Sequence, residues 1–202
     1  MTEISFGASF KTYATVQKLV NGKYIPFKTS IVKAEQSDLE SLAKTARAWK
    51  RPFACQMEQA IELSKYDANA DIRNVYILTK QQNNFSRLIP KDILGMVYLY
   101  QAPKRNTLEY IQVHPDIELN NYPLSVRFKD KLLKLFGIPK NNARKYLDIG
   151  SNLVKYLQKT YNDKRMELAY VRTTKNFYKK LGFKSEISAL SSRMVWVPKS
   201  SK

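Results

Sequence analysis

The first part of the chain alternates apolar and polar residues in the manner of β-strands. The segment KTYATVQKLVNGKYIPFKTSIVKA, residues 11–34, holds two such runs on either side of Asn21-Gly22. An Asn-Gly pair between alternating runs favours a two-residue hairpin turn. We therefore expect an N-terminal β-hairpin over about residues 9–30.

Helical spacing follows the hairpin. Ser37 and Glu40 have the spacing of a capping box, which stabilises the first turn of a helix. Pro52 suits the first turn of a second helix, because proline lacks the N–H that is unpaired there. The apolar positions expected to face the core in the first helix are Leu39, Leu42, Ala43 and Ala46.

The remainder predicts three adjacent strands and then an alternation of helices and strands. The strands are expected at 74–80, 92–101 and 108–114, followed by a helix near 148–161, a strand at 166–171, a helix at 176–182 and a strand at 194–197. Adjacent strands favour antiparallel pairing, and the later alternation favours a parallel crossover. The fold class is therefore α/β, with a mixed, mostly antiparallel central sheet flanked by helices, in a single domain over residues 1–202.

A long basic segment interrupts this order at about 116–145. Within it, Ser125 to Phe136 carries an apolar stripe at helical spacing, with Arg and Lys mainly off the stripe. We expect an inserted basic helical segment here.

Composition excludes several classes of protein. With 44% apolar and 12% aromatic residues, the chain can bury a core. No apolar run reaches the roughly 18 residues of a membrane span, and the start lacks an export signal. Cys55 is the only cysteine, which fits a reducing cytoplasm. One cysteine and one histidine argue against a zinc site, so no metal is expected.

Charge is the unusual property, at +18 overall. Residues 117–202 carry 19 basic and 6 acidic residues, so the excess lies mainly in the second half. Nucleic acid, an acidic protein and a polyphosphate cofactor are the candidate partners, and a lysine-rich surface without a ligand is the alternative.

The helix expected near Ile149 is a candidate phosphate site. The start of a helix presents unpaired N–H groups and the positive end of the helix dipole. Gly150 would let an anion approach the backbone, and the side chains of Ser151 and Asn152 could add donors. His114 precedes a proline at a strand end and is expected to be a turn residue.

Three segments in this order resemble the GCN5-related N-acetyltransferase (GNAT) family. LEYIQVHPD at 108–116 resembles the family's fourth strand, KYLDIGSNL at 145–153 its pyrophosphate-binding motif, and NFYKKLGF at 176–183 its Phe-Tyr-x-x-x-Gly-Phe element. The resemblance covers roughly residues 30–197 and implies an acyl-CoA N-acyltransferase fold with acetyl-CoA as cosubstrate.

The resemblance also implies residue roles. The N–H of Val113 would polarise the thioester carbonyl, Tyr178 would protonate the departing thiolate, and Glu109 is the first candidate for the base. The structural alternative for Tyr178 is a tyrosine whose ring is buried and whose hydroxyl contacts solvent. The structural alternative for Glu109 is a solvent-exposed glutamate on a strand. The implied cofactor-binding residues are Val113, Lys145, Asp148, Ile149, Gly150, Ser151, Asn152 and Phe177.

The chain departs from the family pattern at several points. Lys145 replaces an arginine or glutamine, and Asp148 replaces the first glycine of the pyrophosphate motif. Asp148 has a structural explanation as the N-cap of the helix, and its carboxylate would weaken CoA binding if it faced the diphosphate. The 116–145 insertion would lie beside the acceptor cleft. Val171 stands where many members carry asparagine.

Three functions follow from these features. The first is an N-acetyltransferase that moves an acetyl group from acetyl-CoA to a primary amine by direct attack in a ternary complex, with an aminoacyl-tRNA as one possible acceptor. The second is an inactive module of the same fold that binds nucleic acid or an acidic protein. The third is an interaction scaffold that uses the 125–136 helix.

Overall fold

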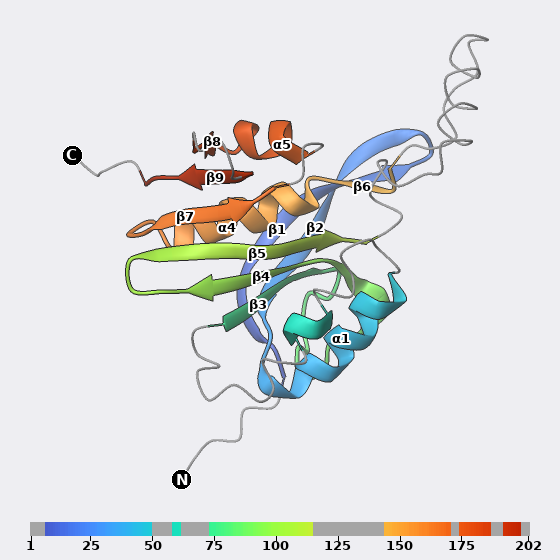
Figure 1. Cartoon of the computed structure of the whole chain (residues 1–202). Coiled ribbons are helices and arrows are strands. Elements are labelled where there is room, and N and C mark those ends of the chain that lie inside the picture. Colours follow the sequence, from blue (N-terminus) through green and yellow to red (C-terminus); the bar gives the residue numbers. More distant parts are fainter. Residues whose placement is uncertain are drawn as a thin grey trace.

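The protein is organised around one large sheet, seen in a computed structural model that describes residues 7–49, 58–61, 73–114, 144–170, 174–186 and 192–198 (Figure 1). The strand order is β6-β1-β2-β3-β4-β5-β7-β9-β8. Among the described strands only the β5–β7 pair is parallel, so the sheet is mixed and mostly antiparallel, as expected. The strands are β1 Ser9–Val20, β2 Lys23–Lys33, β3 Arg73–Thr79, β4 Ile93–Gln101, β5 Arg105–Val113, β6 Tyr146–Leu147, β7 Arg165–Ala169, β8 Lys184–Ser185 and β9 Arg193–Trp196.

The described ranges do not include every segment for which the sequence made a prediction. Pro52, Cys55 and Val171 lie outside them, as does the basic helix expected at 125–136. Within these ranges, no helix combines the length and the apolar character needed to cross a bilayer.

The N-terminal hairpin forms as predicted. Strands β1 and β2 pair over almost their full length, and the turn residues Asn21 and Gly22 have φ of 48° and 76°. Positive φ at both turn positions gives a turn whose twist matches that of the strands, and asparagine and glycine tolerate this conformation best.

Helix α1 (Leu39–Ala48) buries the four apolar positions expected of it, but it begins differently. A 3₁₀ turn, η1 (Gln36–Asp38), precedes it, and the Asp38 carboxylate accepts a hydrogen bond of 3.0 Å from the N–H of Glu35. The capping box is therefore Glu35/Asp38, and the predicted Ser37/Glu40 pair was wrong. The added 3₁₀ turn moves the first unpaired N–H groups upstream.

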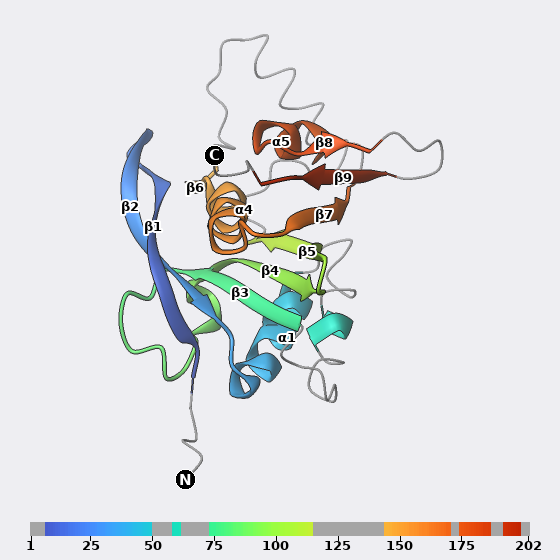
Figure 2. The same ribbon diagram turned by 90° about the vertical axis from the view of Figure 1, so that its left-hand side faces the viewer.

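Two helices cover opposite faces of the sheet, α1 on one face and α4 (Ile149–Thr160) on the other (Figures 1 and 2). Each face has its own buried core. Helix α4 lies so close to the sheet that a Cβ built on Gly95 would come within 2.6 Å of the Ile149 side chain. The lack of a side chain at Gly95 thus fixes the position of the start of α4 over β4.

Helix α5 (Lys175–Lys180) ends as the sequence predicts. Gly182 has φ of 85°, and the N–H groups of Gly182 and Phe183 bond back to the carbonyls of Lys179 and Tyr178. The Phe183 ring is 2% exposed and packs 5.8 Å from the Tyr178 ring. This left-handed glycine turn brings the chain back into the core.

A buried carboxylate ties three strands together. Glu167 of β7 is 1% exposed and forms ion pairs with Arg105 of β5, Arg165 of β7 and Arg193 of β9. Burial and the neighbouring guanidinium groups of Arg105 and Arg165 lower the pKa of Arg193. We call these four residues the Glu167 clasp, because the strands that they join meet at this carboxylate.

Candidate active site

Strands β5 and β7 separate after a short paired stretch. Their parallel pairing covers only four positions, from Arg105↔Arg165 to Leu108↔Leu168, although β5 continues to Val113. Residues 109–113 of β5 therefore have no strand partner on the β7 side within the part of the chain that the structure describes. An unpaired strand edge can bind an extended ligand through its backbone N–H and C=O groups.

A β-bulge lies where this separation begins. Tyr98 of β4 pairs with Tyr110, and the next residue, Leu99, pairs with Leu108, so Glu109 is the extra residue. Leu108 and Ile111 both contact the core under α4, whereas Tyr110 packs against the core under α1. The bulge thus turns the open part of β5, and bulges are frequent beside active sites. The side chain of Glu109 is exposed.

The N–H of Val113 faces the opening. His114 donates a hydrogen bond of 2.8 Å from its N–H to the carbonyl of Leu94, on the β4 side. The carbonyl of Gln112 also lies on that side, 3.2 Å from a Cβ built on Gly95. Because backbone groups alternate between the two edges of a strand, the N–H of Val113, which lies between them, points to the β7 side.

The head of α4 adjoins this open edge. A Cβ built on Gly150 would lie 3.8 Å from the Ile111 side chain. Residues 149–151 open the helix, and no described residue accepts a hydrogen bond from their backbone N–H groups. Free N–H donors and the positive end of the helix dipole therefore stand beside the separated strands.

The side-chain donors expected at this helix head are used within the protein. The Ser151 hydroxyl donates to the carbonyl of Asp148 at 3.1 Å, and the Asn152 amide donates to the carbonyl of Thr15 at 2.9 Å. An anion at this place would be bound by backbone N–H groups, because the Ser151 hydroxyl bonds within the helix head and the Asn152 side chain fixes the helix against β1.

Asp148 holds the N-cap position but does not cap with its side chain. Its φ is 66°, its side chain is exposed, and it makes no side-chain capping bond. The sequence located the cap correctly, but the expected capping role of the carboxylate was wrong. The left-handed backbone explains why glycine fits here and why aspartate, which tolerates that region, can replace it.

Tyr178 is the more deeply buried of the two aromatic residues of α5. Tyr178 is 6% exposed and belongs to the core under α4, while Phe177 is half-buried. The Phe177 ring would lie 3.2 Å from a Cβ built on Gly150, and it packs edge-on against Tyr178 at 4.9 Å. A continuous contact thus runs from the head of α4 through Phe177 to Tyr178.

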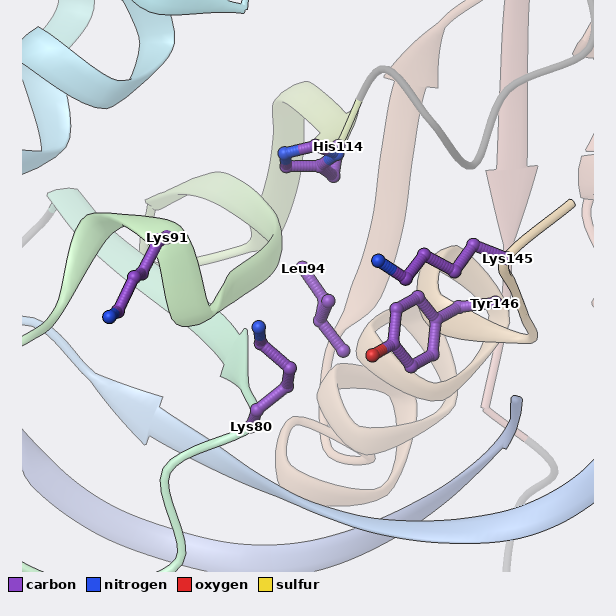
Figure 3. Close-up of a pocket in the computed structure, with 6 residues that line it drawn as sticks. All are labelled: Lys80, Lys91, Leu94, His114, Lys145 and Tyr146. Carbon is purple, nitrogen blue, oxygen red and sulfur yellow. The ribbon is translucent and has the colours of Figure 1, made fainter. Parts of the chain in front are cut away.

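Lys145 lies in a separate pocket near the same helix head (Figure 3). Its other lining residues are Lys80, Lys91, Leu94, His114 and Tyr146. His114 also packs edge-on against Trp49 at 5.6 Å. Lys80 and Lys91 could not be predicted as site residues from the sequence, because neither lies in a motif and only the fold brings them near Lys145.

Comparison with solved structures identifies the architecture. The chain is similar to AtaT complexed with acetyl-methionyl-tRNAfMet, with 12% identity, 84% of this chain and 94% of that chain covered, and a TM-score of 0.50. It is also similar to PaiA N-acetyltransferase from Thermoplasma acidophilum in complex with coenzyme A, at 17% identity, 83% and 96% coverage, and a TM-score of 0.49. A putative GNAT acetyltransferase from Desulfovibrio desulfuricans matches at 11% identity, with 91% and 96% coverage and a TM-score of 0.42.

No protein-family model and no curated protein sequence matches the chain. At 12% identity the AtaT likeness concerns the fold alone. The sheet is mixed, has helices on both faces and contains a parallel pair that separates after four positions. Together with the likeness to AtaT, these features show that this chain has the acyl-CoA N-acyltransferase fold of the GNAT family.

Proposed function

We propose that the chain transfers an acetyl group from acetyl-CoA to a primary amine by direct attack in a ternary complex. The observation that carries the proposal is the open edge of β5 beside the free N–H groups at the head of α4. This arrangement offers a hydrogen-bonding edge for an extended arm and an anion site for a diphosphate, which are the two main parts of CoA.

Each residue then has a defined task. Acetyl-CoA supplies the activated acyl group. The N–H of Val113 stabilises the negative charge that develops on the acyl oxygen as the amine attacks. Glu109, directly or through water, accepts the proton that the amine loses, and the Tyr178 hydroxyl donates a proton to the departing thiolate. The N–H groups of Ile149, Gly150 and Ser151 hold the diphosphate.

Ligand stabilisation tests cofactor binding. Acetyl-CoA should raise the melting temperature, because a ligand that binds only the folded state at 100 times its Kd adds about 2.7 kcal/mol of stability. Gly150→Glu should abolish this shift, since its side chain would meet the Phe177 ring and place a carboxylate at the diphosphate site.

Turnover tests the role of Tyr178. Tyr178→Phe keeps the ring in the core and should leave the acetyl-CoA shift intact while it slows acetyl transfer about 100-fold, a typical loss for a general acid. Tyr13→Phe, at an exposed ring on β1, is the matched control and should change neither quantity. Equal turnover by both variants would remove Tyr178 from the mechanism.

A second function is supported by Asp148. A carboxylate at the head of α4 opposes a diphosphate, while residues 117–202 carry 19 basic and 6 acidic residues. We propose, as the alternative, a module that binds nucleic acid without acetyl transfer. Binding of RNA with a steep salt dependence, and no stabilisation by acetyl-CoA, would establish this alternative.

An acceptor that carries phosphates fits the first proposal. The basic second half of the chain would attract it, and AtaT, which shares the fold, was solved with acetyl-methionyl-tRNAfMet. We therefore propose aminoacyl-tRNA as the acceptor class to assay first.

A further inference from the structure

The pocket that contains Lys145 brings together residues from widely separated parts of the chain. Lys80 follows β3, Lys91 lies in the 3₁₀ turn η3 (Pro90–Asp92), and Lys145 directly precedes β6. In Figure 3 the side chains of Lys80 and Lys145 extend into the pocket from below and from the right, and Lys91 lies at its outer side with its ammonium group directed away from theirs. We call this the lysine pocket.

Its charge is not balanced by the described part of the chain. Lys80 pairs with Asp92 at 2.9 Å. No described carboxylate forms an ion pair with Lys91 or Lys145. Three ammonium groups and one carboxylate give the pocket a net charge of about +2. A phosphate monoester near pH 7 has a charge of about −2, which would neutralise it.

The other lining groups suit a phosphate as well. Leu94 is 3% exposed and contributes an apolar side chain, whereas Tyr146 directs its hydroxyl into the pocket (Figure 3). That hydroxyl forms no hydrogen bond with any described residue, although the Tyr146 ring is buried. Ammonium and phenol donors match the several acceptor oxygens of a phosphate, whereas a single carboxylate would balance only half of the charge.

The pocket is separate from the proposed diphosphate site. Its walls come from the ends of β3 and β5, from η3, from the start of β4, and from Lys145 and Tyr146 at the start of β6. The diphosphate site is instead built from backbone N–H groups of residues 149–151. Lys80 and Lys91 belong to the lysine pocket alone and therefore allow it to be tested without changing the head of α4.

We infer that the lysine pocket binds a phosphate group, distinct from any diphosphate at the head of α4. The phosphate belongs either to the ribose of the cofactor or to the acceptor, and both sources present the same chemistry. The pocket would bind phosphate even if the chain transfers no acetyl group, so the inference goes beyond the proposed function.

The test measures melting temperature in inorganic phosphate against chloride at equal ionic strength, so that general salt effects cancel. Wild type should show a shift specific to phosphate. The double variant Lys80→Gln/Lys91→Gln should weaken phosphate binding at least about tenfold, because each lost charged donor contributes a charge-assisted hydrogen bond. Lys104→Gln is the matched control, since Lys104 is exposed at the opposite end of β5 and should leave the shift unchanged.

Repeating the measurement with saturating CoA identifies the source of the phosphate. A shift that persists with CoA assigns the pocket to the acceptor. A shift that disappears with CoA but persists with 3′-dephospho-CoA assigns it to the ribose phosphate of the cofactor. A shift that disappears with both, that is absent in wild type, or that is unaffected by the double variant would overturn the inference. Failure of CoA to bind would refute the proposed function and leave the phosphate result in free protein valid.

Discussion

At the scale of single residues, the sequence predicted the position of Asp148 at the start of a helix but not its backbone conformation. Its position before the helix was readable, because aspartate commonly precedes a first turn. Its φ of 66° could not be predicted, because the chain adopts this left-handed conformation where it passes from β6 into α4, and that connection depends on the fold. Glycine would adopt the same φ without strain.

Substitutions at Asp148 should separate charge from backbone. Asp148→Asn keeps a residue that tolerates positive φ and removes the charge, so it should raise the affinity for acetyl-CoA about five- to tenfold by removing repulsion of the diphosphate. Asp148→Ala removes the same charge but should lower the free energy of unfolding by about 1 kcal/mol, because alanine is strained at positive φ. Calorimetric titration and chemical denaturation measure the two effects, and an unchanged affinity in Asp148→Asn would show that the carboxylate does not oppose the cofactor.

The relative burial of Phe177 and Tyr178 could not be predicted from the sequence of α5. Helix α5 has six residues, too few to define an apolar stripe by periodicity. The half-exposed position of Phe177 depends on Gly150, which is distant in sequence and offers a surface without a Cβ. Contacts of this kind become visible only when the fold is known.

At the scale of elements, strands were predictable but their separation was not. The apolar and β-branched runs located β3, β4 and β5 within a few residues. The bulge at Glu109 and the end of pairing at Leu108 depend on partners in β4 and β7, which the sequence of β5 does not specify. The two-residue strands β6 and β8 are too short to leave a pattern.

The substitution Val113→Pro tests whether the N–H group at the open edge of β5 takes part in catalysis. Val113→Pro removes an N–H that faces the opening, so the β4–β5 ladder should survive while turnover falls about 100-fold, the usual loss for one oxyanion donor. Acetylation kinetics and a thermal melt measure the two outcomes. Gln112→Pro is the control, because it removes an N–H on the β4 side and should destabilise the sheet. Full activity in Val113→Pro would exclude this N–H from catalysis.

At the scale of the whole molecule, the order of elements and the fold class followed from the sequence, whereas the lysine pocket did not. Local patterns predict the longer helices and strands, and the resemblance of three ordered segments predicts the order in which they follow one another. The lysine pocket depends on Lys80, Lys91 and Lys145 meeting at the ends of several elements, and only tertiary structure creates that meeting.

The net charge of +18 predicts that the affinity for a nucleic acid depends on salt concentration. If the acceptor or partner is a nucleic acid, binding should weaken by at least about tenfold between 50 and 200 mM salt, because displaced counterions favour the complex less at high salt. Equilibrium binding of transfer RNA across this range provides the measurement, with stabilisation by acetyl-CoA in the same buffers as the comparison. An affinity for RNA that does not change with salt would contradict an electrostatic partner site.

The Glu167 clasp joins β5, β7 and β9 within the four positions where β5 and β7 still pair. It therefore lies at the apex of the angle between two diverging strands. A small rotation of β7 relative to β5 at this point produces a larger displacement at the open ends of the two strands, because the strands are stiff. The four residues of the Glu167 clasp, which lie outside both proposed ligand sites, are therefore placed to set the angle at which β5 and β7 diverge.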